Sequence, residues 1–361
     1  MTAPTPPEHT LIQQLLSSLQ ALPETQASLT ESPNAEAAAG LAGATIDLRI
    51  AGKSVLVLAE ARKSLYPRDI RQILWRLTAM PPGQQGAVRH LLAADLLSPG
   101  AKALLREHGI GYFDSGGSLF LPAPGAYVFI DRPTPKGSVK PAQSLYTGRR
   151  AQVLHTLLSD TRLPDWFGVN QIAEHAQVAA STASNVLTML EKLDWLVSRG
   201  SGPGKERQLR EPAALLDAWA ERVSAQRAPA LSRYFVPGLK ADALTDKLAE
   251  VFDAHQVIYA VSYEAAAQRY APFLSTISQV RVRVLPGDGA ASALAQLGAR
   301  KVTEGANLVI ISATSMGELQ YRQNLGGIWL ASPVQVYLDL SHGEGRASEM
   351  AAHLRQERMG Y

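Results

Sequence analysis

Short hydroxyl and amide side chains recur at helical spacing between residues 181 and 193. At about 100° per residue, Ala183, Val186, Leu187 and Leu190 share one face, and polar side chains share the opposite face. An ordinary surface helix would more often carry Glu and Lys there, whereas small uncharged groups can reach base edges in the major groove of DNA. The candidate DNA-binding residues of this helix are Ser181, Thr182, Ser184, Asn185, Thr188 and Lys192.

The neighbouring residues predict the elements that would position this helix. Residues 151–158 supply a first helix, and Ile172 and Ala173 fit a short second one. Residues 178–180 fit the turn before the third helix, which Ser181 could cap through its hydroxyl. This order predicts a helix-turn-helix with a three-helix core.

A glycine-rich basic loop follows the third helix. Residues 195–199 predict one strand, residues 206–210 predict a second, and the intervening Gly-Ser-Gly-Pro-Gly-Lys is too rich in glycine for either a strand or a helix. Such a hairpin is typical of a wing that contacts phosphates or the minor groove. It does not fit a nucleotide-binding P-loop, since the spacing from glycine to Lys205 is wrong and Lys205 is followed by Glu206 instead of Ser or Thr. The cations near the tip are Arg199, Lys205 and Arg207.

Two acidic residues in the N-terminal part suggest metal chemistry. Asp47 lies on a predicted strand, residues 45–50, and Glu60 lies on its predicted hairpin partner, residues 54–61, where it shares a face with Arg62. Two carboxylates that converge on one divalent cation, with a base beside the attacking water, can hydrolyse a phosphodiester.

The order of these elements, with Asp47 on one strand and Glu60-Ala61-Arg62 on the next, resembles the core of the PD-(D/E)xK restriction-endonuclease superfamily. The resemblance implies a restriction-endonuclease-like α/β fold, with Arg62 at the position of the family's lysine. Arginine stays protonated at any accessible pH, and Lys63 points to the opposite face, so we expect a degenerate domain without catalytic residues. The alternatives are a metal-dependent DNA nuclease and two solvated strand carboxylates.

The composition of the chain limits the classes of function that it can have. The 361 residues are 46% hydrophobic, which predicts several folded domains, and the net charge of +3 is too mild to indicate a nucleic-acid partner by itself. The absence of cysteine excludes disulfides and thiol catalysis and fits a cytoplasmic protein. The eight histidines lack metal spacing, and no cofactor motif, signal peptide or membrane span is expected.

Periodicity along the chain predicts a multidomain α/β (α+β) fold. A leucine stripe in residues 10–22 predicts a helix that faces a core or a dimer contact, and helices alternate with strands in residues 241–358. The predicted units are residues 1–43 (N-terminal helix and linker), 44–131 (restriction-endonuclease-like α/β domain), 132–146 (linker), 147–225 (central winged helix-turn-helix) and 231–361 (C-terminal α/β domain).

Two further segments carry a family resemblance. Residues 91–119 resemble bacterial regulators that place such a domain ahead of a winged helix. Residues 331–340, Ala-Ser-Pro-Val-Gln-Val-Tyr-Leu-Asp-Leu, and residues 345–354 are similar to the C-terminal region of the AbiEi family of type IV toxin-antitoxin regulators. The resemblance implies a DNA-binding transcriptional regulator, an antitoxin that represses its own operon beside a nucleotidyltransferase toxin. We expect a repressor that binds double-stranded DNA as a homodimer. We expect residues 231–361 to serve partner binding or assembly and to be dispensable for basic DNA affinity.

Overall fold

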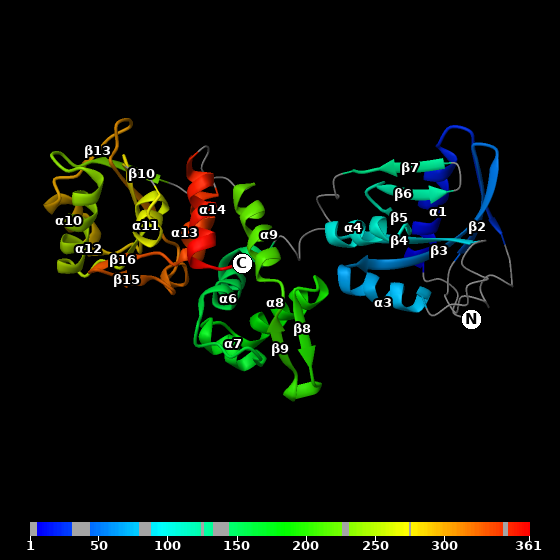
Figure 1. The fold of residues 1–361 in the computed structure, drawn as a ribbon, viewed down its shortest axis with the longest axis horizontal. Helices are drawn as coiled ribbons and strands as arrows, with labels where there is room; N and C mark the ends of the chain where they lie inside the picture. Colours follow the sequence, from blue (N-terminus) through cyan, green and yellow to red (C-terminus); the bar gives the residue numbers. More distant parts are fainter. Residues whose placement is uncertain are drawn as a thin grey trace. The chain divides into compact units, whose positions relative to one another are not determined.

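The computed structural model of the chain describes residues 6–30, 44–78, 88–123, 126–132, 144–225, 231–273, 276–341 and 346–361 (Figure 1). The chain forms two compact units, Met1–Ala142 with Met189–Asp194 and Gln143–Thr188 with Trp195–Tyr361. Each unit has a seven-stranded sheet of its own, so the expected α/β class is confirmed. No helix in the described ranges is long and apolar enough to cross a membrane.

The sheet of the N-terminal unit follows the order of the sequence. Its centre, β3 to β5, is parallel, and the strands on either side pair antiparallel with their neighbours. Ala51 and Gly52 turn β2 into β3 with positive φ angles of 49° and 76°. The strands are β1 (Thr25–Thr30), β2 (Ala44–Ile50), β3 (Lys53–Leu65), β4 (Val88–Leu97), β5 (Gly111–Asp114), β6 (Leu119–Ala123) and β7 (Ala126–Ile130).

Helices lie on both faces of this sheet. The leucine stripe of α1 (Pro6–Gln20), including Leu15 and Leu19, packs into one core with the inward side chains of β2 and β3. The other core contains side chains of α3 (Pro67–Thr78) and α4 (Pro99–Glu107). Burial of apolar side chains on both faces holds the sheet between these helices.

The N-terminal boundary differs from the expectation. We placed the start of the folded domain at residue 44, but β1 pairs with β2 along its whole length and α1 packs on the sheet. The sequence of β1, Thr-Gln-Ala-Ser-Leu-Thr, buries only Ala27 and therefore lacks the hydrophobic alternation that marks a strand.

The second unit begins with three helices and a small hairpin. The elements are α6 (Gly148–Ser159), α7 (Val169–His175), α8 (Ala180–Lys192), β8 (Leu196–Arg199), β9 (Glu206–Leu209) and α9 (Pro212–Ser224). We expected Ser181 to be the N-cap of α8. The helix begins at Ala180, so Ser181 lies inside it.

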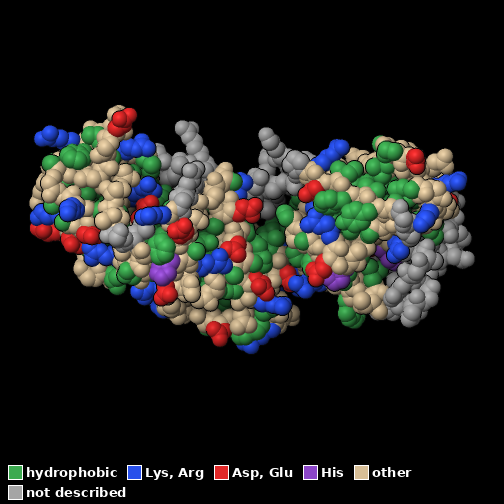
Figure 2. Space-filling model, turned by 45° about the horizontal axis from the view of Figure 1, so that its top comes forward, with side chains coloured by type: hydrophobic (Ala, Val, Ile, Leu, Met, Phe, Trp, Pro, Cys, Tyr) green, Lys and Arg blue, Asp and Glu red, His purple; other side chains and the backbone are tan. Residues whose placement is uncertain are grey.

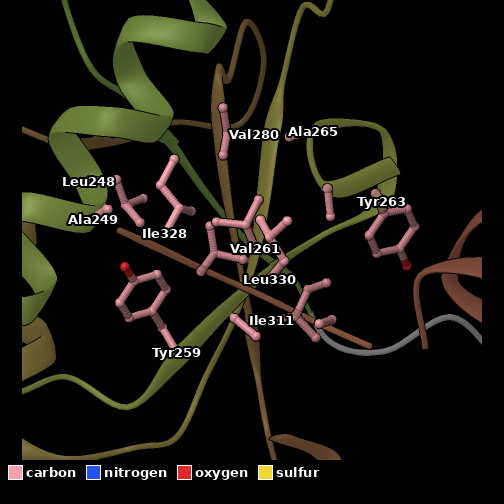
Figure 3. Packing of buried hydrophobic residues seen from close by; sticks show 14 of the residues in the cluster. Leu248, Ala249, Tyr259, Val261, Tyr263, Ala265, Val280, Ile311, Ile328 and Leu330 are labelled. Atoms are coloured by element: carbon pink, nitrogen blue, oxygen red, sulfur yellow. The ribbon is translucent and has the colours of Figure 1, made fainter. Parts of the chain in front are cut away.

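A second seven-stranded sheet follows, in the order β13-β10-β14-β12-β11-β16-β15. Figure 3 shows Val261 of β11, Leu330 of β16 and Ile311 of β14 in the middle of its core. Val261 and Leu330 are direct partners in the parallel pair of β11 and β16. The strands are β10 (Leu231–Phe235), β11 (Tyr259–Ser262), β12 (Val280–Val284), β13 (Arg300–Lys301), β14 (Leu308–Ser312), β15 (Gln323–Leu325) and β16 (Ile328–Leu330). The helices are α10 (Ala241–Ala254), α11 (Tyr263–Tyr270), α12 (Asp288–Gln296), α13 (Pro333–Leu340) and α14 (Arg346–Arg358).

The helical part and the C-terminal sheet are joined by buried polar contacts. His155 of α6 lies 2.5 Å from Ser332 Oγ at the start of α13, and the Thr156 hydroxyl lies 2.8 Å from Tyr321 Oη. Tyr321 Oη also donates to the carbonyl of His175. These contacts lie within the unit that contains residues 143–188 and 195–361, whereas the sequence suggested separate domains for residues 147–225 and 231–361. The C-terminal part therefore contacts both α6 and α7.

Candidate nucleic-acid interface

The helix α8 has one buried and one exposed face. Ala183, Val186, Leu187 and Leu190 are buried, as their spacing predicted. On the other side, Ser181, Asn185 and Thr188 are exposed, and Thr182 and Ser184 are half-buried. The surface between them carries hydroxyl and amide groups without a charged side chain. A face of this kind can donate to and accept from base edges.

The turn before α8 is fixed by the backbone. Gln177 has a φ of 54°, in the left-handed region, and the next amide, of Val178, donates to the carbonyl of Ala173. At the start of α7, the side chain of Gln171 accepts from the amide of Gly168 at 2.8 Å. These bonds set the angle between α7 and α8.

The loop between α6 and α7 is held by a buried carboxylate. Arg162 donates to both oxygens of Asp160 at 2.9 Å, and His175 Nδ1 lies 2.9 Å from Asp160 Oδ2. The hydrogen bonds from the Arg162 side chain hold the pKa of Asp160 well below its usual range, and the contact with His175 acts in the same direction. The exposed guanidinium of Arg162 is thereby fixed beside α7.

An arginine on the β8–β9 hairpin is held in place by two neighbours. The Arg199 guanidinium lies over the ring of Trp166, 4.3 Å from its centroid, and Nε lies 2.7 Å from Glu206 Oε2. Arg199 remains 56% exposed in its side chain, so part of its donor set faces solvent. Trp166 was missed by the sequence analysis, and its only signal there is a large aromatic residue shortly before a helix.

The position of Arg207 contradicts the sequence analysis. We expected it near the wing tip, facing phosphates, but its side chain is buried. The strand β9 is covered on both sides: Ser198 of β8 is the partner of Arg207 on one side, and Phe167 exchanges two backbone hydrogen bonds with it on the other. The two candidate lysines are more accessible than Arg207: Lys205 is half-buried and Lys192 is exposed.

The acidic residues of the N-terminal unit do not converge. Asp47 pairs with Leu56, four residues before Glu60 along β3, which corresponds to about 13 Å at the rise of a strand. Asp47 is exposed, whereas Glu60 is buried in an ion pair with Arg62, and Arg76 Nη2 lies 3.7 Å away. The two carboxylates therefore cannot hold one cation as the sequence suggested, and in the described part of the chain no group of three or more acidic or histidine residues could hold a metal.

A model of a known protein family matches the C-terminal part of the chain. Residues 208–359 match a family model described as "Transcriptional regulator, AbiEi antitoxin, Type IV TA system". The match starts in β9 and extends through α14, so the C-terminal part is similar to these regulators and α6 to α8 lie outside the match.

Two other comparisons add little. No curated protein matches this chain. A solved structure described as "Structure of EndoMS in apo form" is 16% identical, with 34% of this chain and 50% of that chain covered. The chain thus spans half the length of that structure. The TM-score is 0.22, so the similarity supports neither a fold nor an activity.

Proposed function

We propose that α6 to β9 form a winged helix-turn-helix and that the protein is a sequence-specific regulator of transcription that binds double-stranded DNA. The exposed face of α8 supports this most strongly, because its side chains are short, uncharged and able to pair with bases. In the proposed complex Ser181, Ser184, Asn185 and Thr188 face the major groove. Thr182 borders that face of α8, and Lys192 lies at its C-terminal end.

The hairpin β8–β9 acts as the wing in this proposal. Arg199 and Lys205 supply positive charge toward phosphates, and Trp166 keeps the Arg199 guanidinium oriented. The buried Arg207 takes no part in the contact. Phosphate contacts of this kind fix the register of the protein on DNA but carry no sequence information.

The family match to residues 208–359 supports a more specific role. We infer that the protein represses its own operon as the antitoxin of a type IV toxin-antitoxin system, with the C-terminal part in contact with a nucleotidyltransferase toxin. A homodimer would present α8 to two half-sites of a palindromic operator. A nucleotidyltransferase gene next to this one would support the toxin assignment.

Substitutions in α8 and in the wing should have different effects on DNA affinity. Asn185 can make a bidentate contact to adenine, so Asn185→Ala should cost about 1–3 kcal/mol on a duplex selected by the wild-type protein and little on a scrambled duplex. Lys205→Ala should weaken both complexes and lower the slope of log K against log[salt] by about 0.9. Titrations at several salt concentrations measure both quantities.

A lysine of the same unit provides a control for the loss of one positive charge. Lys247 of α10 is a half-exposed lysine that pairs with Glu250, and Lys247→Ala should leave both affinities and the salt slope unchanged. Equal losses on the two duplexes for Asn185→Ala would show that α8 does not read sequence, and the proposed function would be wrong.

Nuclease activity is the second candidate function, and the separation of Asp47 from Glu60 argues against it. Supercoiled plasmid DNA incubated with the protein and Mg²⁺ or Mn²⁺ should stay intact, because Asp47 and Glu60 lie too far apart to bind one cation. Gel electrophoresis checks the result. Nicking that Glu60→Ala abolishes would establish the nuclease alternative.

A further inference from the structure

The strand β7 is an edge of the N-terminal sheet. It pairs antiparallel with β6, and none of the other described strands pairs with its free side. Its sequence, Ala-Tyr-Val-Phe-Ile, contains neither a charge nor a proline. Proteins usually protect such edges with charged residues, proline or a bulge, because the unpaired backbone groups can bind another strand. An unprotected edge is therefore a candidate interface.

Two exposed aromatic side chains lie on one face of β7. Tyr127 is 71% exposed and Phe129 is 46% exposed. Both rings contact Phe120 edge-on, at centroid distances of 5.6 and 6.4 Å, and the Arg106 guanidinium lies 5.4 Å from the Phe129 centroid. Figure 2 shows hydrophobic side chains on the part of this unit that carries β7. Large aromatic groups this exposed are typical of protein interfaces.

Charged side chains lie near both ends of β7. A surface depression at its start is lined by Arg89, His108 and Tyr127. Asp131 is the residue after the end of β7. Its Oδ1 lies 3.4 Å from Lys102 Nζ, and its side chain is 56% exposed. A second strand that ran antiparallel to β7 and had the same sequence would place its own Asp131 beside that depression. The exposed carboxylate of Asp131 in one copy would then face the depression that Arg89 lines in the other copy.

We propose that β7 pairs antiparallel with β7 of a second copy of this chain, about a twofold axis at Val128. Tyr127 of each copy then lies opposite Phe129 of the other, an aromatic cross-strand pair on the exposed face. The pairing joins the two sheets into one and satisfies the free backbone groups of both edges. The proposal gives the expected homodimer its interface. It rests on the strand edge alone, so it stands or fails separately from DNA binding.

Charges placed on the edge should separate the copies. The wild-type chain is expected to sediment at twice its 38.8 kDa mass at tens of micromolar, and the double variant Tyr127→Lys, Phe129→Lys at 38.8 kDa. Leu29 of β1, 44% exposed on the opposite edge of the same sheet, provides the control, and Leu29→Lys should remain dimeric. Circular dichroism shows whether each variant is folded. A monomeric wild-type chain, or a folded double variant that stays dimeric, would overturn the proposal.

Engineered cysteines test the register even where lysine prevents folding. The natural chain has no cysteine, so each introduced thiol is the only one. Residues opposite each other in an antiparallel pair have Cα atoms about 4.5–5.5 Å apart, within disulfide range. Mild oxidation should link Val128→Cys to itself and Tyr127→Cys to Phe129→Cys, while Leu29→Cys stays unlinked. Absence of the Val128→Cys dimer, or equal linking of Leu29→Cys, would show that β7 is not the interface.

Discussion

Replacement of Asp339 by alanine should lower the free energy of unfolding by about 3–5 kcal/mol, because it leaves a buried arginine without its main partner. Asp339 of α13 is buried and accepts from Arg283 Nε at 3.0 Å, from Arg283 Nη2 and from Ser262 Oγ. Gln335 donates to it at 2.8 Å. Without Asp339, the Arg283 guanidinium still contacts the carboxylate of Glu318, which is partly exposed. Denaturant unfolding measures the loss.

An exposed ion pair of the same unit is the matched control. Asp217 of α9 pairs with Arg355, and its side chain is 57% exposed. Because water solvates both groups after the change, Asp217→Ala should cost at most about 1 kcal/mol. If Asp339→Ala costs no more than this control, the buried network does not stabilise the C-terminal part.

Helical periodicity predicted the candidate interface well. The spacing of Ala183, Val186, Leu187 and Leu190 is a local property of one helix, so the sequence placed the buried face of α8 correctly. The exposure of Asn185 follows from the same period. Whether α8 enters the major groove stays a prediction.

Features that depend on pairing between distant segments could not be predicted in this way. Arg207 is buried, and its backbone pairs with Phe167, which is separated from it in the chain by the whole of α7 and α8. The distance from Asp47 to Glu60 depends on the β2–β3 register, which the turn at Ala51 and Gly52 sets. A strand pattern shows which face a residue occupies but not how far along the strand its partner lies.

Sequence periodicity also could not predict the contacts between the helical part and the C-terminal sheet. His155 of α6 is buried against the Trp219 and Tyr321 rings and contacts Ser332. Burial and, after it, the positive charge of Arg283 together lower the pKa of His155 to about 4, although the charge of Asp339 acts in the opposite direction. His155 is therefore neutral at pH 7 in the folded protein.

The neutral His155 should make stability depend on pH between about 6.5 and 4. The folded-state pKa is below the unfolded value of 6.5, so the unfolded chain binds a proton first and stability falls as the pH is lowered through this range. At 1.36 kcal/mol per pKa unit, the total loss is about 3 kcal/mol. Denaturant unfolding at a series of pH values, followed by tryptophan fluorescence, should show this slope in the wild type and a flatter one in His155→Gln. The surface variant His255→Gln should keep the wild-type slope. A His155→Gln profile parallel to that of the wild type over this range would show that His155 does not titrate in the buried joint.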